Sequence, residues 1–343
     1  MKKIVGLTYD LKSDWISRPD DPVDAAAELD TEKTIHSLIR AITSGGFEVK
    51  KIGHVNNLLK NIDNLGVDIV FNIAEGQHGR NRESQVPMIL EMNDIPFVGG
   101  DALNMGVTLD KILAKKCFMA DGIPTPRYFN ATREDDLKSL NTIGYPLIVK
   151  CRFEGSSKGI SRHSRVLNFK ELKEQVDRVH TAYQQAALCE EFISGTEFTV
   201  GVLGTEKPVA MPVVQVKLEG KLDLGDDFYT FSRLQRPELV EYICPAPISQ
   251  ALEKKLQDMA CHAYRSVDCR DFGRVDFRVD KNGNPYVLEI NPLPCLSEED
   301  VFYVASKAMG ITYEEIIIRI LKFAMDRCGL SHGTLSRHLV GAH

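Results

Sequence analysis

The first hundred residues alternate between short apolar runs and amphipathic stretches, and this alternation limits the possible folds more than any other feature. Buried strands are predicted at residues 3–9, 47–52, 67–73 and 96–98. Helices are predicted between them, at residues 28–43, 55–62 and 83–92. Strands and helices in this order form a parallel sheet with helices on its faces. No G-x-G-x-x-G motif follows the first strand, which disfavours a dinucleotide site.

The composition excludes several classes of protein. The 343 residues include 42 basic and 48 acidic side chains, a formal net charge of −6, whereas nucleic-acid binders usually carry a basic excess. No run approaches the roughly 18 apolar residues of a membrane span, and the N-terminus turns polar too soon for a signal peptide. Eight cysteines are scattered without a C-x-x-C pair. We expect a reduced, cytoplasmic protein of two to three domains, without nucleic-acid or membrane partners.

After the first hundred residues the pattern becomes less regular. Helices are predicted at residues 108–120, with Thr108 as N-cap, and at 169–184 and 249–267, and residues 301–327 are predicted to be mostly helical. Strands are predicted at residues 145–150, 187–193, 198–203 and 209–216. The Ile-Pro-Thr-Pro run at 123–126 indicates a domain junction, residues 219–245 a candidate mobile loop, and residues 331–343 a disordered tail.

Two alternating runs near the end of the chain are joined by Asn282-Gly283, the strongest short-range signal of a β-hairpin. A two-residue type I′ turn at this dipeptide would place Asp276 opposite Glu289. It would likewise place Arg274 opposite Asn291. Because side chains alternate along a strand, all four would share one face, with opposed Cβ atoms about 5 Å apart.

Two opposed carboxylates repel each other unless a cation lies between them. Hard oxygen ligands suit Mg²⁺, so Asp276, Glu289 and Asn291 are candidate metal ligands. Arg274 beside them could neutralise charge on a transferred phosphoryl group. The alternative is a solvated hairpin face with incidental ion pairs.

Two lysines and a glycine-serine loop are candidates for phosphate binding. Lys111 falls in the first turn of its helix, where the helix dipole disfavours a cation, and Lys150 ends an apolar strand. Small residues in the loop at 154–160 let backbone N–H groups approach phosphate oxygens, although this is not a Walker A loop. Residues 190–197 link two strands and could offer backbone groups to a flat base. The alternatives are solvent-exposed lysines, an ordinary connector and a surface hinge.

Taken together, these segments resemble the ATP-grasp fold and, within it, the D-alanine–D-alanine ligase family. The resemblance covers nearly the whole chain and rests on EGSSKGI after a strand lysine, EEFISGTEFTVGVLG, CRDFGRVDFRVD and the late E-I-N. It implies a mixed α/β protein with an N-terminal parallel α/β domain at 1–104 and a central lid domain at 105–195. A C-terminal antiparallel-sheet domain at 196–330 and the tail at 331–343 would follow.

The resemblance also implies roles for the candidate residues. The implied ATP contacts are Lys111, Lys150, Ser156 and Ser157 at the phosphates, Glu190, Phe192 and Ile193 at adenine, and Glu197 at ribose, with Leu288 also in the cofactor site. Arg274 would stabilise the transferring phosphate and the tetrahedral intermediate, with Ser156 as a second catalytic residue. Asp276, Glu289 and Asn291 would hold two Mg²⁺ ions, with Mn²⁺ as an alternative.

Several substrate-side segments depart from the family pattern. No glycine-rich loop with a glutamate for the first D-alanine follows the first strand. The family segment H-G-x-x-G-E-D-G is replaced by a stretch that contains Glu75, Arg80 and Arg82 as candidate substrate residues. The loop at 219–245 offers Tyr229, Arg233 and Arg236 in place of a lysine–tyrosine pair.

Two further departures lie just after the hairpin. Asp300 stands where the family has a serine for the second D-alanine's carboxylate, and Cys295 stands in place of a glycine. An aspartate would repel a carboxylate, so we expect an acceptor that is not a plain D-amino acid. Arg80 and Arg82 could pair with an extra carboxylate or phosphate on the donor, the alternative being surface ion pairs. For Cys295, a reactive thiol and a packing residue both stay open.

The function expected from these features is an ATP-dependent carboxylate–amine ligase that forms an amide through an acyl phosphate. Its partners would be a small carboxylate and a small amine, with substrates other than two D-alanines, and a homodimer is possible. The alternatives are a D-alanine–D-alanine ligase proper, an ATP-grasp phosphotransfer enzyme without an amide product, and a nucleotide-binding protein without turnover.

Overall fold

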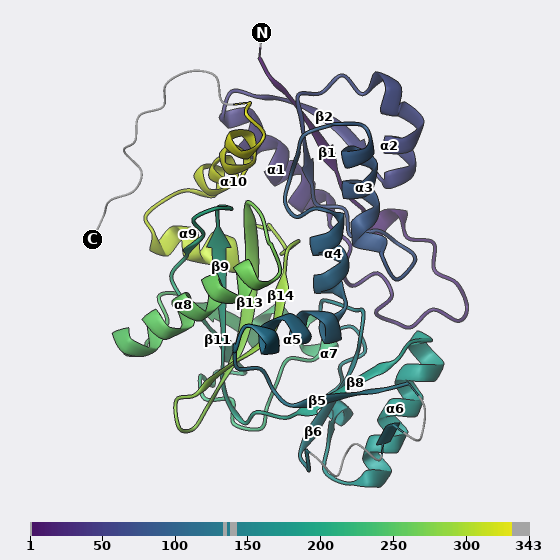
Figure 1. Cartoon of the computed structure of the whole chain (residues 1–343), viewed down its shortest axis with the longest axis vertical. Helices are drawn as coiled ribbons and strands as arrows, with labels where there is room; N and C mark the ends of the chain where they lie inside the picture. The colour runs from purple at the N-terminus through teal and green to yellow at the C-terminus, as the bar shows by residue number, and fades with distance from the viewer. Residues whose placement is uncertain (1, 133–135, 138–142, 331–343) are drawn as a thin grey trace.

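The computed structural model describes residues 2–132, 136–137 and 143–330 and contains three β-sheets (Figure 1). The first sheet is parallel, with the order β2-β1-β3-β4. Its strands are β1 (Ile4–Thr8), β2 (Glu48–Gly53), β3 (Ile69–Asn72) and β4 (Phe97–Val98). The intervening helices are α1 (Glu32–Ser44), α2 (Val55–Asn61) and α3 (Gln85–Met92). The predicted parallel α/β arrangement is therefore confirmed, although α1 begins at Glu32 rather than at residue 28.

The second sheet is antiparallel, with the order β5-β8-β6-β7. Its strands are β5 (Tyr128–Ala131), β6 (Leu147–Cys151), β7 (Arg165–Val166) and β8 (Ala187–Glu191), and helix α6 (Phe169–Tyr183) packs against it. Figure 1 shows this sheet at the opposite end of the molecule from the first one. Strands β5 and β7 were not predicted, because runs of four and two residues carry little periodic signal.

The third sheet lies between the other two and has the order β12-β11-β9-β13-β14, with β10 paired to β9 (Figure 1). Its strands are β9 (Gly195–Leu203), β10 (Val209–Ala210), β11 (Val214–Leu218), β12 (Val240–Ile243), β13 (Phe272–Asp280) and β14 (Pro285–Asn291). The single strand predicted at 209–216 is thus two strands. The segment at 219–245 includes the short helix α7 (Phe231–Leu234) and β12. Helix α8 (Gln250–Ser266) covers one face of the sheet.

The helix predicted at 108–120 is wrong at its start. The chain forms two helices there, α4 (Ala102–Leu109) and α5 (Lys111–Ala120), separated by Asp110. The Asp110 carboxylate accepts hydrogen bonds from the N–H groups of Ile112 and Leu113, which makes it the N-cap of α5. The Thr108 hydroxyl instead donates to the Asn104 carbonyl inside α4.

The first sheet shares its hydrophobic core with the last two helices, α9 (Val301–Ala308) and α10 (Tyr313–Arg327), which lie in the stretch predicted to be mostly helical. Leu7 of β1, Leu38 of α1 and Ile317 of α10 lie in one cluster, and all three side chains are fully buried. Figure 1 shows α10 beside α1 and β1. The first strand, the first helix and the last helix are therefore packed into a single core.

Each of the three expected domains holds one sheet, whereas the exact boundaries at 104 and 195 stay a prediction. The tail predicted at 331–343 lies outside the described residues. No helix among the described residues is long and apolar enough to cross a membrane. The eight cysteines are all free thiols.

Asp271 joins three parts of the chain at the start of β13. Its buried carboxylate accepts hydrogen bonds from the Gly99 N–H (2.8 Å), from the Thr205 hydroxyl (3.1 Å) and from the Arg327 guanidinium (2.7 and 3.0 Å). Arg327 ends α10, and Gly99 follows β4. One carboxylate thus ties the third sheet to both the first sheet and the last helix.

We expect Asp271→Asn to lower the free energy of unfolding by about 2 kcal/mol, because charge-assisted hydrogen bonds to a buried carboxylate are lost. Asparagine keeps the shape of the side chain and tolerates the positive φ of 63° at this position. Urea denaturation followed by circular dichroism measures the change. Asp258→Asn, in an exposed ion pair of α8, is the matched control and should unfold like the wild type. Equal midpoints for the two variants would contradict the role of Asp271.

Candidate active site

The hairpin of β13 and β14 pairs its polar residues as predicted, but its turn differs from the predicted one. Asp276 pairs with Glu289 and Arg274 with Asn291, so both predicted pairs are confirmed. The predicted two-residue turn is wrong, because the Asp280 N–H bonds to the Asn284 carbonyl and encloses a three-residue loop. This shifts the register by one residue at the turn.

A β-bulge restores the register between the turn and the site. Phe277 pairs with Val287 whereas Asp276 pairs with Glu289, which leaves Leu288 as an extra residue on β14. The turn and the bulge each displace the pairing by one residue, in opposite senses. Glu289 consequently lies opposite Asp276 even though the turn differs from the prediction.

Asp276 is the centre of a hydrogen-bonded group. Arg274 donates to its carboxylate through two nitrogens at 2.9 Å, and the Asn291 amide donates at 3.0 Å. The Thr199 hydroxyl donates at 2.6 Å from β9, where it pairs directly with Asp276. Nothing in the sequence marked Thr199, because its relation to the hairpin depends on sheet order. Arg274, Asp276, Glu289 and Asn291 all line a cavity of about 440 Å³.

The donor set is compatible with Mg²⁺. Asp276 and Glu289 supply carboxylate oxygens and Asn291 an amide oxygen, from one face of one hairpin. Burial opposes ionisation of Glu289, but Lys111 and Lys150 outweigh it and lower its pKa to about 2. No group of three or more His, Cys, Asp or Glu side chains suited to a metal occurs among the described residues. A metal ion here would therefore have two carboxylates and one amide as its protein ligands.

The two predicted lysines approach this site from different elements. Lys111 is the first residue of α5 and forms an ion pair with Glu289. Lys150 lies on β6 and pairs with the buried Glu190 at 2.5 Å, and Lys115 pairs with the same carboxylate at 2.8 Å. Burial opposes ionisation of Glu190, yet the two lysines lower its pKa. Lys115 was not predicted, although it lies one helical turn after Lys111.

The glycine-serine loop lines the large cavity with Ser156 and Ser157, whose φ angles of 46° and 56° are in the left-handed region. Residues outside the loop hold this backbone in place. The Glu28 carboxylate accepts a hydrogen bond from the Gly155 N–H, and Asp24 accepts one from the Gly159 N–H at 2.8 Å. Neither acid was predicted, because both come from an irregular segment more than a hundred residues away in sequence.

The expected adenine residues surround a smaller cavity of about 90 Å³. Its lining includes Phe192, Ile193, Glu197 and Leu288 together with Lys150. Ser157, Asp276 and Glu289 line both this cavity and the large one. Glu197 accepts a hydrogen bond from Arg278 at 3.0 Å. Arg278 also donates to the Ile193 carbonyl and lies over the Phe192 ring. Arg278 is thus a further residue of this region that was not predicted.

The expected substrate residues divide into two groups. Glu75, Tyr229, Cys295 and Asp300 line the large cavity. Arg80, Arg82 and Arg233 are absent from the described walls of both cavities. Cys295 lines the cavity and is exposed, which does not fit a packing residue, while desolvation and the nearby Asp300 raise the pKa of its thiol. The Asp300 carboxylate lies 4.0 Å from Arg274 and accepts a hydrogen bond from the Val301 N–H at the start of α9.

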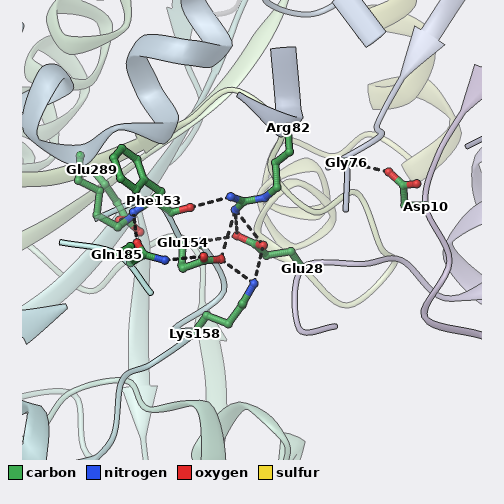
Figure 2. Close-up of polar contacts among 11 residues, drawn as sticks. Asp10, Glu28, Gly76, Arg82, Phe153, Glu154, Lys158, Gln185 and Glu289 are labelled. Carbon is green, nitrogen blue, oxygen red and sulfur yellow. Dashed lines mark hydrogen bonds and ion pairs between the residues drawn. The ribbon is translucent and has the colours of Figure 1, made fainter. Parts of the chain in front are cut away.

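The three arginines are engaged by protein acids. Figure 2 shows Arg82 between Glu28 (2.8 Å) and Glu154 (3.4 Å), with the Phe153 carbonyl as a further acceptor. Arg80 pairs with Asp110 at 3.1 Å. Arg233 pairs with Glu219 and Asp227. A substrate anion would have to displace these partners.

Known proteins match both the sequence and the fold. A family model described as the D-ala D-ala ligase C-terminus matches residues 117–322. The D-alanine–D-alanine ligase of Carboxydothermus hydrogenoformans is 32% identical over 302 residues, which cover 86% of this chain and 93% of that protein. The uncharacterized protein y4sG of Sinorhizobium fredii is 35% identical over 262 residues, covering 76% and 75%.

Solved structures show the same fold. The ATP complex of D-alanine–D-alanine ligase from Bacillus anthracis has a TM-score of 0.74 at 20% identity and covers 95% of this chain and 99% of its own. VanG D-Ala:D-Ser ligase from Enterococcus faecalis has a TM-score of 0.73 at 20% identity, covering 94% and 100%. The protein is an ATP-grasp enzyme of the class that joins carbon to nitrogen. It belongs to the D-alanine–D-alanine ligase family, as the sequence motifs predicted.

We expect Asp276→Ala and Glu289→Ala to abolish ATP-dependent turnover, because each removes a proposed ligand of Mg²⁺. ADP release in a coupled assay, with circular dichroism as a check on folding, measures the effect. Glu241→Ala on β12 removes an exposed carboxylate paired with Lys217 in the same sheet and should leave turnover unchanged. Full activity of a folded Asp276 or Glu289 variant would refute the metal assignment.

Proposed function

We propose that this enzyme joins a carboxylate to an amine through an acyl phosphate and that its substrates are not two D-alanines. The observation that carries the reaction type is the meeting of Arg274, Asp276, Glu289 and Asn291 with Lys111 and Lys150 where the two cavities adjoin. Cations and metal ligands at one point suit the transfer of a phosphoryl group.

In this proposal the smaller cavity holds the adenine and the glycine-serine loop covers the phosphates. Phe192, Ile193 and Leu288 offer apolar surface to a base, and Glu197 offers a carboxylate to ribose hydroxyls. Lys111 and Lys150 neutralise phosphate charge once they leave their present carboxylate partners. Mg²⁺, when bound by Asp276, Glu289 and Asn291, supplies further charge neutralisation.

The chemistry needs positioning and charge stabilisation more than a protein nucleophile. A carboxylate oxygen of the donor forms a bond to the γ-phosphorus as the bond to the ADP oxygen breaks. The amine of the acceptor then forms a bond to the acyl carbon and loses a proton, and inorganic phosphate leaves. Arg274 faces the cavity and is placed to stabilise the charge on both the phosphoryl oxygens and the carbonyl oxygen.

Asp300 supports the proposal that the acceptor substrate has no carboxylate near this position. It lies on the cavity wall at 4.0 Å from Arg274, so its negative charge occupies the environment that would otherwise attract an acceptor carboxylate. D-alanine–D-alanine ligase activity itself is the second candidate, because relatives of that name match most of the chain. The expected cytoplasmic location and homodimer belong to the proposal and stay predictions.

We expect little ADP release with ATP, Mg²⁺ and D-alanine as the sole substrate, and new amide masses with a mixed pool of amino and carboxylic acids. Mass spectrometry of the pool and a coupled ADP assay provide the measurements. Robust turnover with D-alanine alone would support the second candidate instead. ADP formation without any condensed product would indicate phosphoryl transfer that does not lead to an amide.

We expect Asp300→Ser to raise kcat/KM for an acceptor with an α-carboxylate by roughly tenfold, because a like charge is removed. Serine is also a good N-cap, so α9 should remain intact. Asp300→Asn, which removes the charge but keeps the size, separates electrostatics from space. No gain in either variant would contradict the role given to Asp300.

A further inference from the structure

Glu75 and Glu83, called here the carboxylate pair, line the large cavity. Both belong to the part of the cavity wall that the N-terminal region forms. Glu75 follows β3, and Glu83 lies in the short 3-10 turn Arg82–Ser84 that precedes α3. Glu83 is only 7% exposed. Burial raises the pKa of Glu75, and the charge of Glu83 raises it further.

Other acids of this region have basic partners. Glu28 and Glu154 share Arg82 and Lys158, as Figure 2 shows. Elsewhere in the lining of the large cavity, Glu298 pairs with Arg40 and Glu299 with Lys33. In contrast, the described part of the chain provides neither member of the carboxylate pair with a side-chain hydrogen bond or an ion pair of its own.

The nearby cations are directed elsewhere. Arg82 donates to Glu28 and Glu154, and Lys111 is paired with Glu289. Burial raises the pKa of Glu83 to about 8, in spite of the nearby Arg82. Asp30 lies on the same wall and adds a third acid, with Lys12 as the base that offsets it. The wall therefore carries acids that burial shifts toward the neutral form and that form no ion pair with the nearby Arg82 or Lys111.

Burial disfavours the charged form of the Glu83 carboxyl group and of the half-buried Glu75, and a cationic ligand on this wall would favour that form. A single α-ammonium group would leave one member of the carboxylate pair without compensation. We propose that the carboxylate pair binds a cationic group on the substrate side chain, so that the donor is an amino acid with a basic side chain. This inference rests on the proposed ligase function. It predicts a positively charged group on the donor, whereas Arg80 and Arg82 led us to expect an additional negatively charged group.

Lysine and norleucine test this proposal, because they have side chains of similar length and differ in the terminal charge. Each is supplied in both enantiomers with ATP, Mg²⁺ and a pool of amines, and amide formation is followed by mass spectrometry. We expect kcat/KM for lysine to exceed that for norleucine by roughly tenfold or more in the wild type. The double variant Glu75→Gln, Glu83→Gln should bring the ratio close to one, with an unchanged KM for ATP.

Glu48→Gln is the matched control, because Glu48 is exposed on the edge strand β2, and it should keep the wild-type ratio. Equal use of lysine and norleucine by the wild type overturns the proposal, and so does a ratio that survives in the folded double variant. If the double variant does not fold, Glu83→Gln alone is compared, and the wild-type ratio still decides.

The two proposals can fail separately. If no amide forms with any donor, the ligase proposal fails. Calorimetry with a non-hydrolysable ATP analogue and Mg²⁺ then tests the carboxylate pair alone. Binding of lysine but not norleucine, lost in Glu83→Gln, supports the pair as a cation site, whereas no difference between the two ligands overturns it.

Discussion

The extra residue Leu288 determines which side chains of β14 face the cavity. Side chains alternate along a strand, so a pairing displaced by one residue would move Glu289 and Asn291 to the opposite face. That face packs against α8 through Val275, Phe277 and their neighbours, and burial of an unpaired carboxylate there would be costly. The bulge allows one short strand to serve an apolar core near the turn and a polar site near its end.

Ion pairs between separate elements complete this arrangement. Glu190 of β8 faces Lys115 of α5, and Arg82 of the N-terminal region faces Glu154 beside the glycine-serine loop. The cost of removing water from each buried pair offsets most of the attraction between its charges. The main effect of these pairs is therefore to fix the geometry of the site. The site is thus positioned by contacts that cross from one sheet region to another.

Much of the fold could be predicted from the sequence, because long strands and helices carry a clear period. The division at Asp110 was missed, since a cap in the middle of a helical pattern competes with the more obvious Thr108. At the site, Asp276 and Glu289 were identified from local spacing, and their pairing was right because two one-residue displacements cancel. Lys115 and Arg278 were not found, because their partners are distant in sequence and only the folded chain brings them together.

The shared core of β1 and α10 has a consequence for biosynthesis. The first sheet is complete in sequence at Val98, but α10, one of the helices that share its core, ends at Arg327. At translation rates of about 5–20 residues per second, roughly 10–45 s separate the synthesis of these two segments. During that interval α1 covers this face of the nascent sheet only in part, so the apolar surface that α9 and α10 later bury is open to wrong association until the last helix has left the ribosome.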